Sequence, residues 1–144
     1  MNQAGDVVFA LAVAAAGITV SKGAFPWSWG TDKDDDERIK PVASIAALDP
    51  LFAASRTTPT LLFLHDPGCP ISRAAYKEVM RLDGEVPLLD VRGARALTRA
   101  VEERTGVRHE SPQIFVLSGG QAVWSASHYA ITTEAVANAV QEAS

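Results

Sequence analysis

The chain has 144 residues, enough for one domain with a sizeable buried core, and 47% of its residues are hydrophobic. Its net charge of −4 and its isoelectric point of about 5.3 argue against the basic surface that nucleic-acid binding needs, so no nucleic-acid partner is expected. Cys69 is the only cysteine, which excludes an intramolecular disulfide and favours a reducing compartment; a cytoplasmic location is expected.

Residues 1–41 are predicted to precede the folded domain as a hydrophobic segment and an acidic linker. Val7–Val20 is a run of 14 uncharged, mostly apolar residues, shorter than the roughly 20 that a membrane-spanning helix needs. Its length suits a signal peptide, but no Lys or Arg precedes it. Three interpretations stay open: a signal, a membrane-associated anchor through residues 7–20, or an extension from an upstream start codon. The charge run Asp32–Arg38 is typical of a solvated tether.

From residue 42 onward, segments with helical spacing of apolar residues alternate with short apolar runs that are typical of buried strands. Pro50 suits the first turn of a helix, and Gly106 suits the end of one. The predicted order is a helix over Ser44–Ser55, a strand over Thr60–Leu64, a helix over Pro70–Leu82, a strand over Val86–Val91, a helix over Ala94–Thr105, strands over Gln113–Leu117 and Gln121–Ser127, and a helix over Thr132–Ala143.

This order consists of two parallel crossovers, a hairpin at the glycine pair Gly119-Gly120 and a closing helix. It predicts an α/β protein with a thioredoxin-like fold, in which a central four-stranded mixed sheet is flanked by helices. The thioredoxin-like domain is expected to cover residues 42–144.

Cys69 lies where the first predicted strand gives way to a helix, within the motif Cys69-Pro70-Ile71-Ser72. A cysteine on such a strand-to-helix turn is typical of thioredoxin-like redox motifs. The free N–H groups and the dipole of a helix N-terminus stabilise a thiolate, which is the reactive form of the thiol. Pro70 suits the first helical position, and the amides of Ile71 and Ser72, with the Ser72 hydroxyl, are expected to face the sulfur. Cys69 is therefore the candidate catalytic residue.

Ser72 stands where a dithiol motif has its second cysteine. A serine cannot attack a mixed disulfide on Cys69, so that intermediate should persist until an external thiol arrives. The alternative is that Cys69 is a packed, inert cysteine.

A second candidate segment, His109–Gln113 (HESPQ), precedes the third predicted strand. In a thioredoxin-like fold this place holds a cis-proline that faces the sulfur, which assigns that position to Pro112 after Ser111. His109 is the histidine best placed to tune or protonate the sulfur; His65 is a weaker candidate, and His128 is expected to be structural. No two histidines have metal-ligand spacing on one element, so no metal site is predicted.

Thr60–Lys77 and Thr105–Thr132 resemble the monothiol bacilliredoxin (YtxJ-like) family, through the CPIS motif, the HESPQ run and the Ser127-His128 pair. The resemblance implies that Cys69 removes bacillithiol from S-thiolated proteins by taking the small thiol onto itself, and that Pro112 is the cis-proline. It implies no bound cofactor, bacillithiol as co-substrate, and S-thiolated proteins and a small thiol reductant as partners. The family often has a lysine and a hydroxyl residue around the strand-end histidine. This chain has Leu64 and Asp66 there, which makes the thiolate less favourable.

Three other functions remain open on sequence grounds. Some glutaredoxins with a C-x-x-S motif carry an iron–sulfur cluster between two chains. A thioredoxin-like module that binds partners without redox activity is a second alternative. A papain-like hydrolase is the third, although the chain is short and shows no evident Asn partner for a Cys–His pair.

Overall fold

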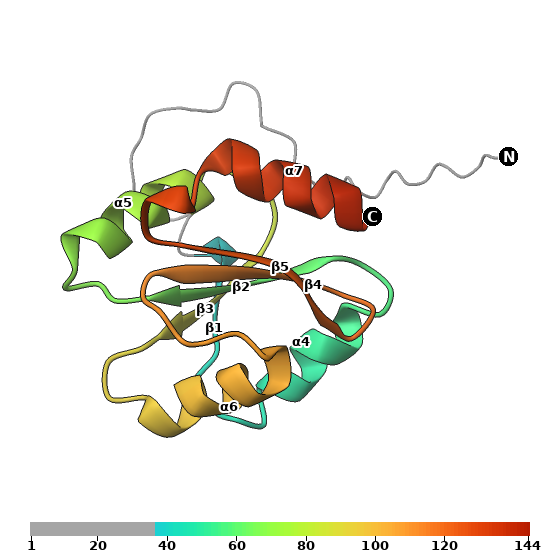
Figure 1. Ribbon diagram of the computed structural model, residues 1–144, viewed down its shortest axis with the longest axis horizontal. Helices are drawn as coiled ribbons and strands as arrows, with labels where there is room; N and C mark the ends of the chain where they lie inside the picture. The colour runs from blue at the N-terminus through green and yellow to red at the C-terminus, as the bar shows by residue number, and fades with distance from the viewer. Residues whose placement is uncertain (1–36) are drawn as a thin grey trace, which may run out of the picture.

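The computed structural model describes residues 37–144 (Figure 1). The hydrophobic segment over residues 7–20 and the linker up to residue 36, with the predictions made for them, lie outside this range. Within residues 37–144, no helix combines the length and the apolar character needed to cross a membrane.

A five-stranded mixed sheet runs through the middle of the molecule, in the order β1-β3-β2-β4-β5. The β1–β3 and β2–β3 pairs are parallel, whereas the β2–β4 and β4–β5 pairs are antiparallel. Four of the strands lie where the sequence predicts them. The strands are β1 (Ile39–Pro41), β2 (Thr60–His65), β3 (Val86–Asp90), β4 (Gln113–Ser118) and β5 (Gln121–Ser127).

The prediction of four strands was wrong, because Ile39–Pro41 adds a fifth at one edge. These three residues fall in the segment that the sequence assigned to the linker. A strand this short shows no alternation, and Pro41 argues against a strand interior. Proline is tolerated on an edge strand, however, since that strand needs hydrogen bonds on one side only.

Helices cover both faces of the sheet, with α5 and α7 on one side and α4 and α6 on the other (Figure 1). Successive residues of β2 alternate between the two cores: Phe63 packs beneath α5 and α7, and Leu64 packs on the side of α4 and α6. Both faces of β2 are therefore buried, which explains its uninterrupted apolar sequence. The helices are α4 (Leu48–Ala54), α5 (Pro70–Val79), α6 (Arg95–Thr105) and α7 (Thr133–Ala143), with a short 3₁₀ turn, η1 (His128–Ala130), before α7.

The ends of α6 and α7 follow the expected local chemistry, but α4 and α5 are shorter than predicted. Helix α4 begins at Leu48, four residues after the predicted Ser44, because hydrogen bonds three residues apart form turns over residues 44–48. Gly106 ends α6 in a left-handed conformation at φ 73°, and the Thr132 hydroxyl oxygen accepts a hydrogen bond from the Ala135 N–H at the start of α7. Helix α5 ends at Val79, three residues earlier than predicted. The Arg38 guanidinium donates hydrogen bonds to the carbonyls of Met80 and Leu82, which gives these carbonyls partners outside the helix.

Candidate active site

Cys69 occupies the position that the sequence predicts, at the N-cap of α5. Its backbone is extended, with φ −103° and ψ 125°, and Pro70 takes the first helical position. The Cys69 N–H donates to the carbonyl of Asp66 at 3.0 Å, which closes a tight turn after β2. Cys69 is partly exposed as a residue.

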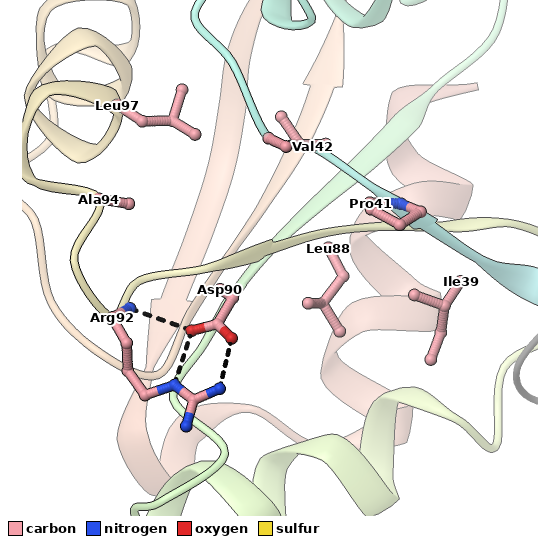
Figure 2. Close-up of a pocket in the computed structure, with 9 residues that line it drawn as sticks. Ile39, Pro41, Val42, Leu88, Asp90, Arg92, Ala94 and Leu97 are labelled. Atoms are coloured by element: carbon pink, nitrogen blue, oxygen red, sulfur yellow. Dashed lines mark hydrogen bonds and ion pairs between the residues drawn. The ribbon is translucent and has the colours of Figure 1, made fainter.

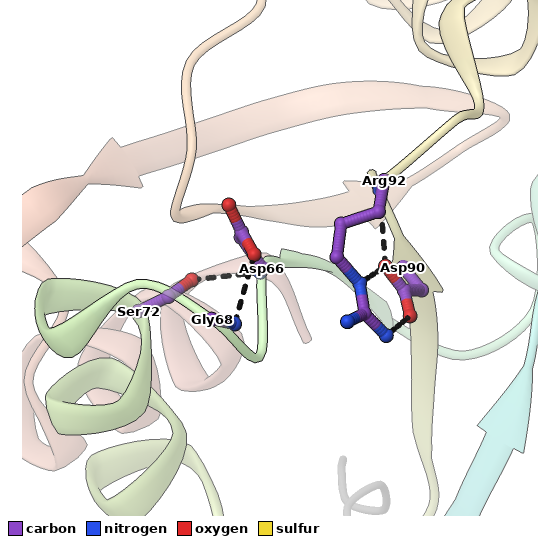
Figure 3. Close-up of polar contacts among 5 residues, drawn as sticks. All are labelled: Asp66, Gly68, Ser72, Asp90 and Arg92. Carbon is purple, nitrogen blue, oxygen red and sulfur yellow. Dashed lines mark hydrogen bonds and ion pairs between the residues drawn. The ribbon is translucent and has the colours of Figure 1, made fainter.

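Ser72 is fully buried, and its hydroxyl oxygen accepts a hydrogen bond from the Asp66 N–H at 2.9 Å. The Asp66 carboxylate in turn accepts from the Gly68 N–H at 2.9 Å, as Figure 3 shows. We expected the Ser72 hydroxyl to face the sulfur. Instead it accepts a hydrogen bond from the backbone of the turn that carries Cys69. The Cys69 side chain makes no capping hydrogen bond with the first turn of the helix.

Ser111 and Pro112 lie at the same end of the sheet as Cys69. Strands β2 and β4 are antiparallel with Leu64 opposite Gln113, so the segment that enters β4 lies beside the segment that leaves β2. The Ser111–Pro112 peptide bond is cis, as predicted, and Pro112 is buried. The Pro112 carbonyl accepts a hydrogen bond from the His128 N–H at 3.0 Å, which joins this loop to the start of η1.

His109 is held in the same loop through its backbone, because its N–H donates to the Glu102 carboxylate at 2.6 Å. Its Nδ1 atom and the Ser111 hydroxyl oxygen are buried, and neither has a hydrogen-bond partner within residues 37–144. His128, expected to be structural, has a left-handed backbone at φ 55°, and its Nδ1 lies 3.3 Å from the Glu110 carboxylate. Both histidines therefore belong to the loop region around Pro112. Ile71 is partly exposed on the first turn of α5.

His65, a weaker candidate on sequence grounds, has surroundings that the sequence did not show. It is the last residue of β2, only 7% exposed, and its ring contacts Phe63 and Tyr76 at centroid distances of 5.3 and 5.2 Å. Its Nδ1 is the third buried side-chain atom without a hydrogen-bond partner in the described range. The alternation of β2 could have revealed this placement, since residues 61, 63 and 65 share the face that α5 covers.

Beside this end of the sheet, Arg92 holds Asp90 through bonds of 2.8 and 3.1 Å to the two carboxylate oxygens. The pair lines a hollow of about 290 Å³ whose other walls are mostly apolar and come from β1, β3 and α6 (Figure 2). Cys69 is not among its lining residues.

A family model described as monothiol bacilliredoxin BrxC matches residues 40–136, more than half of the chain. The chain belongs to the monothiol bacilliredoxin BrxC family. The family resemblance of the CPIS and HESPQ motifs is thereby confirmed.

Solved structures agree with this assignment. A candidate oxidoreductase with a thioredoxin fold is 26% identical, with a TM-score of 0.69 over 75% of this chain and 98% of that one. A mutant thioredoxin from Halobacterium salinarum NRC-1 is 18% identical, with a TM-score of 0.56 over 79% of this chain and 96% of that one. Thioredoxin f from spinach chloroplast is 18% identical, with a TM-score of 0.55 over 74% of this chain and 93% of that one. The fold is thioredoxin-like, and family and fold together assign the bacilliredoxin to the thiol–disulfide oxidoreductases.

Proposed function

We propose that this bacilliredoxin removes bacillithiol from S-bacillithiolated proteins, with Cys69 as the attacking nucleophile. The Cys69 thiolate attacks the bacillithiol sulfur of the mixed disulfide; the disulfide bond between bacillithiol and the client cysteine breaks, and the client leaves as a thiolate. A second bacillithiol thiolate then attacks the new disulfide on Cys69, which releases oxidised bacillithiol and restores the Cys69 thiolate. Each step exchanges one disulfide for another, so the two steps need no other oxidant or reductant.

The observation that carries the proposal is the position of the sole cysteine. Cys69 lies partly exposed at the N-terminus of α5, at the end of the sheet where Ser111 and Pro112 also lie. The helix N-terminus favours a negative charge at this point. The buried Ser72 offers no second sulfur to expel the captured thiol, which matches a one-thiol cycle. The choice of bacillithiol and of thiolated proteins as clients rests on the family.

One observation favours a second candidate, a binding module without redox activity. The Asp66 carboxylate lies in the turn that carries Cys69 and accepts the Gly68 N–H. A negative charge in this place opposes the formation of a thiolate beside it. If this effect outweighs the helix N-terminus, Cys69 is no more nucleophilic than a cysteine in an unfolded peptide.

The test is intact-mass spectrometry of the full chain after mixing with an S-bacillithiolated client protein. The expected result is a mass gain on the bacilliredoxin equal to one bacillithiol in disulfide linkage, with the matching loss from the client. The Cys69→Ser variant should gain nothing. The same client carrying glutathione measures how strongly the site prefers bacillithiol.

A matched control is Ser72→Ala, which keeps the nucleophile and should still acquire the thiol. Absence of any mass gain on the wild-type chain would contradict the proposal. If Cys69 is then alkylated at pH 7 no faster than a cysteine in an unfolded peptide, the binding module is the better description.

A further inference from the structure

His65 lies on the same face of the sheet as α5 and next to the turn that carries Cys69. The ring is enclosed between Phe63 in its own strand and Tyr76 on α5. Only the turn from Asp66 to Cys69 separates the two residues in sequence, and the bond from the Cys69 N–H to the Asp66 carbonyl closes that turn. A charge on the sulfur and a charge on this ring therefore lie at the same end of the domain.

The burial of His65 is unusual for a residue that merely fills a core. Its side chain is only 7% exposed, and its Nδ1 has no hydrogen-bond partner within residues 37–144. A buried polar atom without a partner costs about 1–3 kcal/mol. In natural proteins such an atom calls for a specific explanation, of which a role in the reaction is one.

Charged groups approach the imidazole from two elements. Burial lowers the pKa of His65. The Asp90 and Asp66 carboxylates and the main chain of Ser72 oppose this effect, whereas Arg92 adds to it. Asp90 is the residue directly opposite His65 in the β2–β3 pair. Asp90 and Arg92 act on the ring by their charges from the end of β3, and Asp66 does so from the turn. Helix α5 contributes the uncharged Tyr76 ring, which contacts the imidazole. The imidazole is thus neutral at neutral pH, with two carboxylates that favour its protonation.

We propose that His65 is a proton acceptor coupled to Cys69, so that its imidazole binds a proton when the Cys69 thiol ionises and releases it when the sulfur enters a mixed disulfide. The inference rests on the proposed function, because it assigns the proton of the same exchange reaction. The Cys69 thiol loses its proton and the neutral His65 gains one, through solvent. After attack, the client leaves as a thiolate, His65 returns its proton, and the client is released as a thiol.

The physical basis is mutual coupling of two titrating groups. A thiolate raises the proton affinity of a nearby imidazole, and the resulting imidazolium favours the thiolate to the same degree. When the sulfur is capped, its negative charge disappears and burial again dominates at His65. The effect needs no direct contact between the two side chains, because His65 is buried and a charge on its ring is screened less than a charge in water.

The deciding experiment is a histidine NMR titration of the full chain in two states, reduced and capped at Cys69 by methyl methanethiosulfonate. The cap is small and uncharged, and it needs no client protein. The expected result is that the His65 titration midpoint lies at lower pH in the capped form. The ring of His128, half-exposed and beside Glu110, serves as the internal comparison and should change less. An unchanged His65 midpoint, or a larger change at His109, would overturn the proposal.

A rate measurement supplies a second, independent readout. His65→Gln keeps a polar side chain that cannot hold the proton, and we expect it to slow capping of Cys69 near neutral pH by roughly fivefold, the low end of couplings between two sites. The pH dependence of the capping rate should then follow a single ionisation in the variant, whereas in the wild type it should show two. Should the variant fail to fold, the wild-type titration alone decides. If Cys69 is capped by the reagent but never by a client, the proposed function fails while the coupling still stands.

Discussion

At the scale of single residues, Ser72 determines which half of a dithiol cycle this protein can perform. The side chain occupies the place of a resolving cysteine, but it is fully buried and its oxygen accepts from the Asp66 N–H. The serine is therefore a structural part of the turn as well as a replacement for a thiol. A hydrogen bond of this kind contributes about 0.5–1.5 kcal/mol.

Ser72→Cys should turn the persistent mixed disulfide into a short-lived one. The new thiol can attack the disulfide on Cys69 and expel the small thiol, leaving a disulfide between residues 69 and 72. Intact mass at successive times after capping should show the adduct replaced by a form two hydrogens lighter than the reduced variant. Ser72→Ala is the matched control: it loses the same hydrogen bond but should retain the adduct. A long-lived adduct on Ser72→Cys would show that residue 72 cannot reach the sulfur.

Asp66→Asn should make Cys69 react faster. The amide oxygen of asparagine can still accept from the Gly68 N–H, so the turn is retained while its negative charge is removed. Partly exposed charge pairs contribute ~0.5–1 kcal/mol, which corresponds to a rate of iodoacetamide alkylation at pH 7 higher by roughly two- to fivefold. Asp49→Asn, on α4 at a distance from the turn, is the control. Equal rates for wild type and Asp66→Asn would mean that the carboxylate does not restrain the thiolate.

At the scale of elements, Glu78 joins α5 to the N-terminus of α7. Its carboxylate accepts from both the N–H and the hydroxyl of Thr133 at 2.8 Å. Burial raises the pKa of Glu78, but the Thr133 hydrogen bonds and Arg81 outweigh this effect, so the pKa lies below its ordinary value. The helix that begins next to Cys69 is thus tied to α7.

Glu78→Ala should lower the free energy of unfolding by about 1–2 kcal/mol at pH 7, measured by urea denaturation. Because the folded pKa is depressed, the unfolded state binds more protons between the two pKa values. The stabilisation is therefore complete above pH ~4.3 and is lost as the pH falls through the folded pKa. The difference between wild type and variant should shrink in acid, whereas Glu78→Gln, which keeps an acceptor, should lose less stability at pH 7. A difference that grows in acid would contradict this account.

The elements also show where sequence patterns suffice. Strand β2 is apolar on both faces and Gly106 takes the conformation that glycine favours, so both were predictable from local chemistry. The end of α5 was not, because Arg38 bonds to Met80 and Leu82 from 42 and 44 residues away. Leu82 continues the apolar spacing of the helix, yet it lies beyond the helix end, and its side chain is buried there.

For the molecule as a whole, motifs place Cys69 and Pro112, and the antiparallel register of β2 and β4 brings their segments to one edge. Sequence could not show that Ser72 bonds to the turn, since that depends on the path of the chain over residues 66–72. It also could not show the surroundings of His65, because Tyr76 and Asp90 come from other elements. In both cases the missing information is a tertiary contact that no local pattern encodes.

Because strand β1 pairs with β3, we expect a stable folded unit to include residues before 42. A chain of residues 42–144 lacks β1 and Arg38, leaving one edge of β3 unpaired and the carbonyls at the end of α5 without this donor. Relative to residues 37–144, we expect the melting temperature to fall by at least ~5 °C, since 1 kcal/mol corresponds to about 4–8 °C in a domain of this size. The open edge of β3 should also promote self-association, measured by light scattering. Arg38→Ala in the full chain is the matched control and should reproduce only part of the loss. Equal melting temperatures for the two truncated chains would place the start of the domain at residue 42.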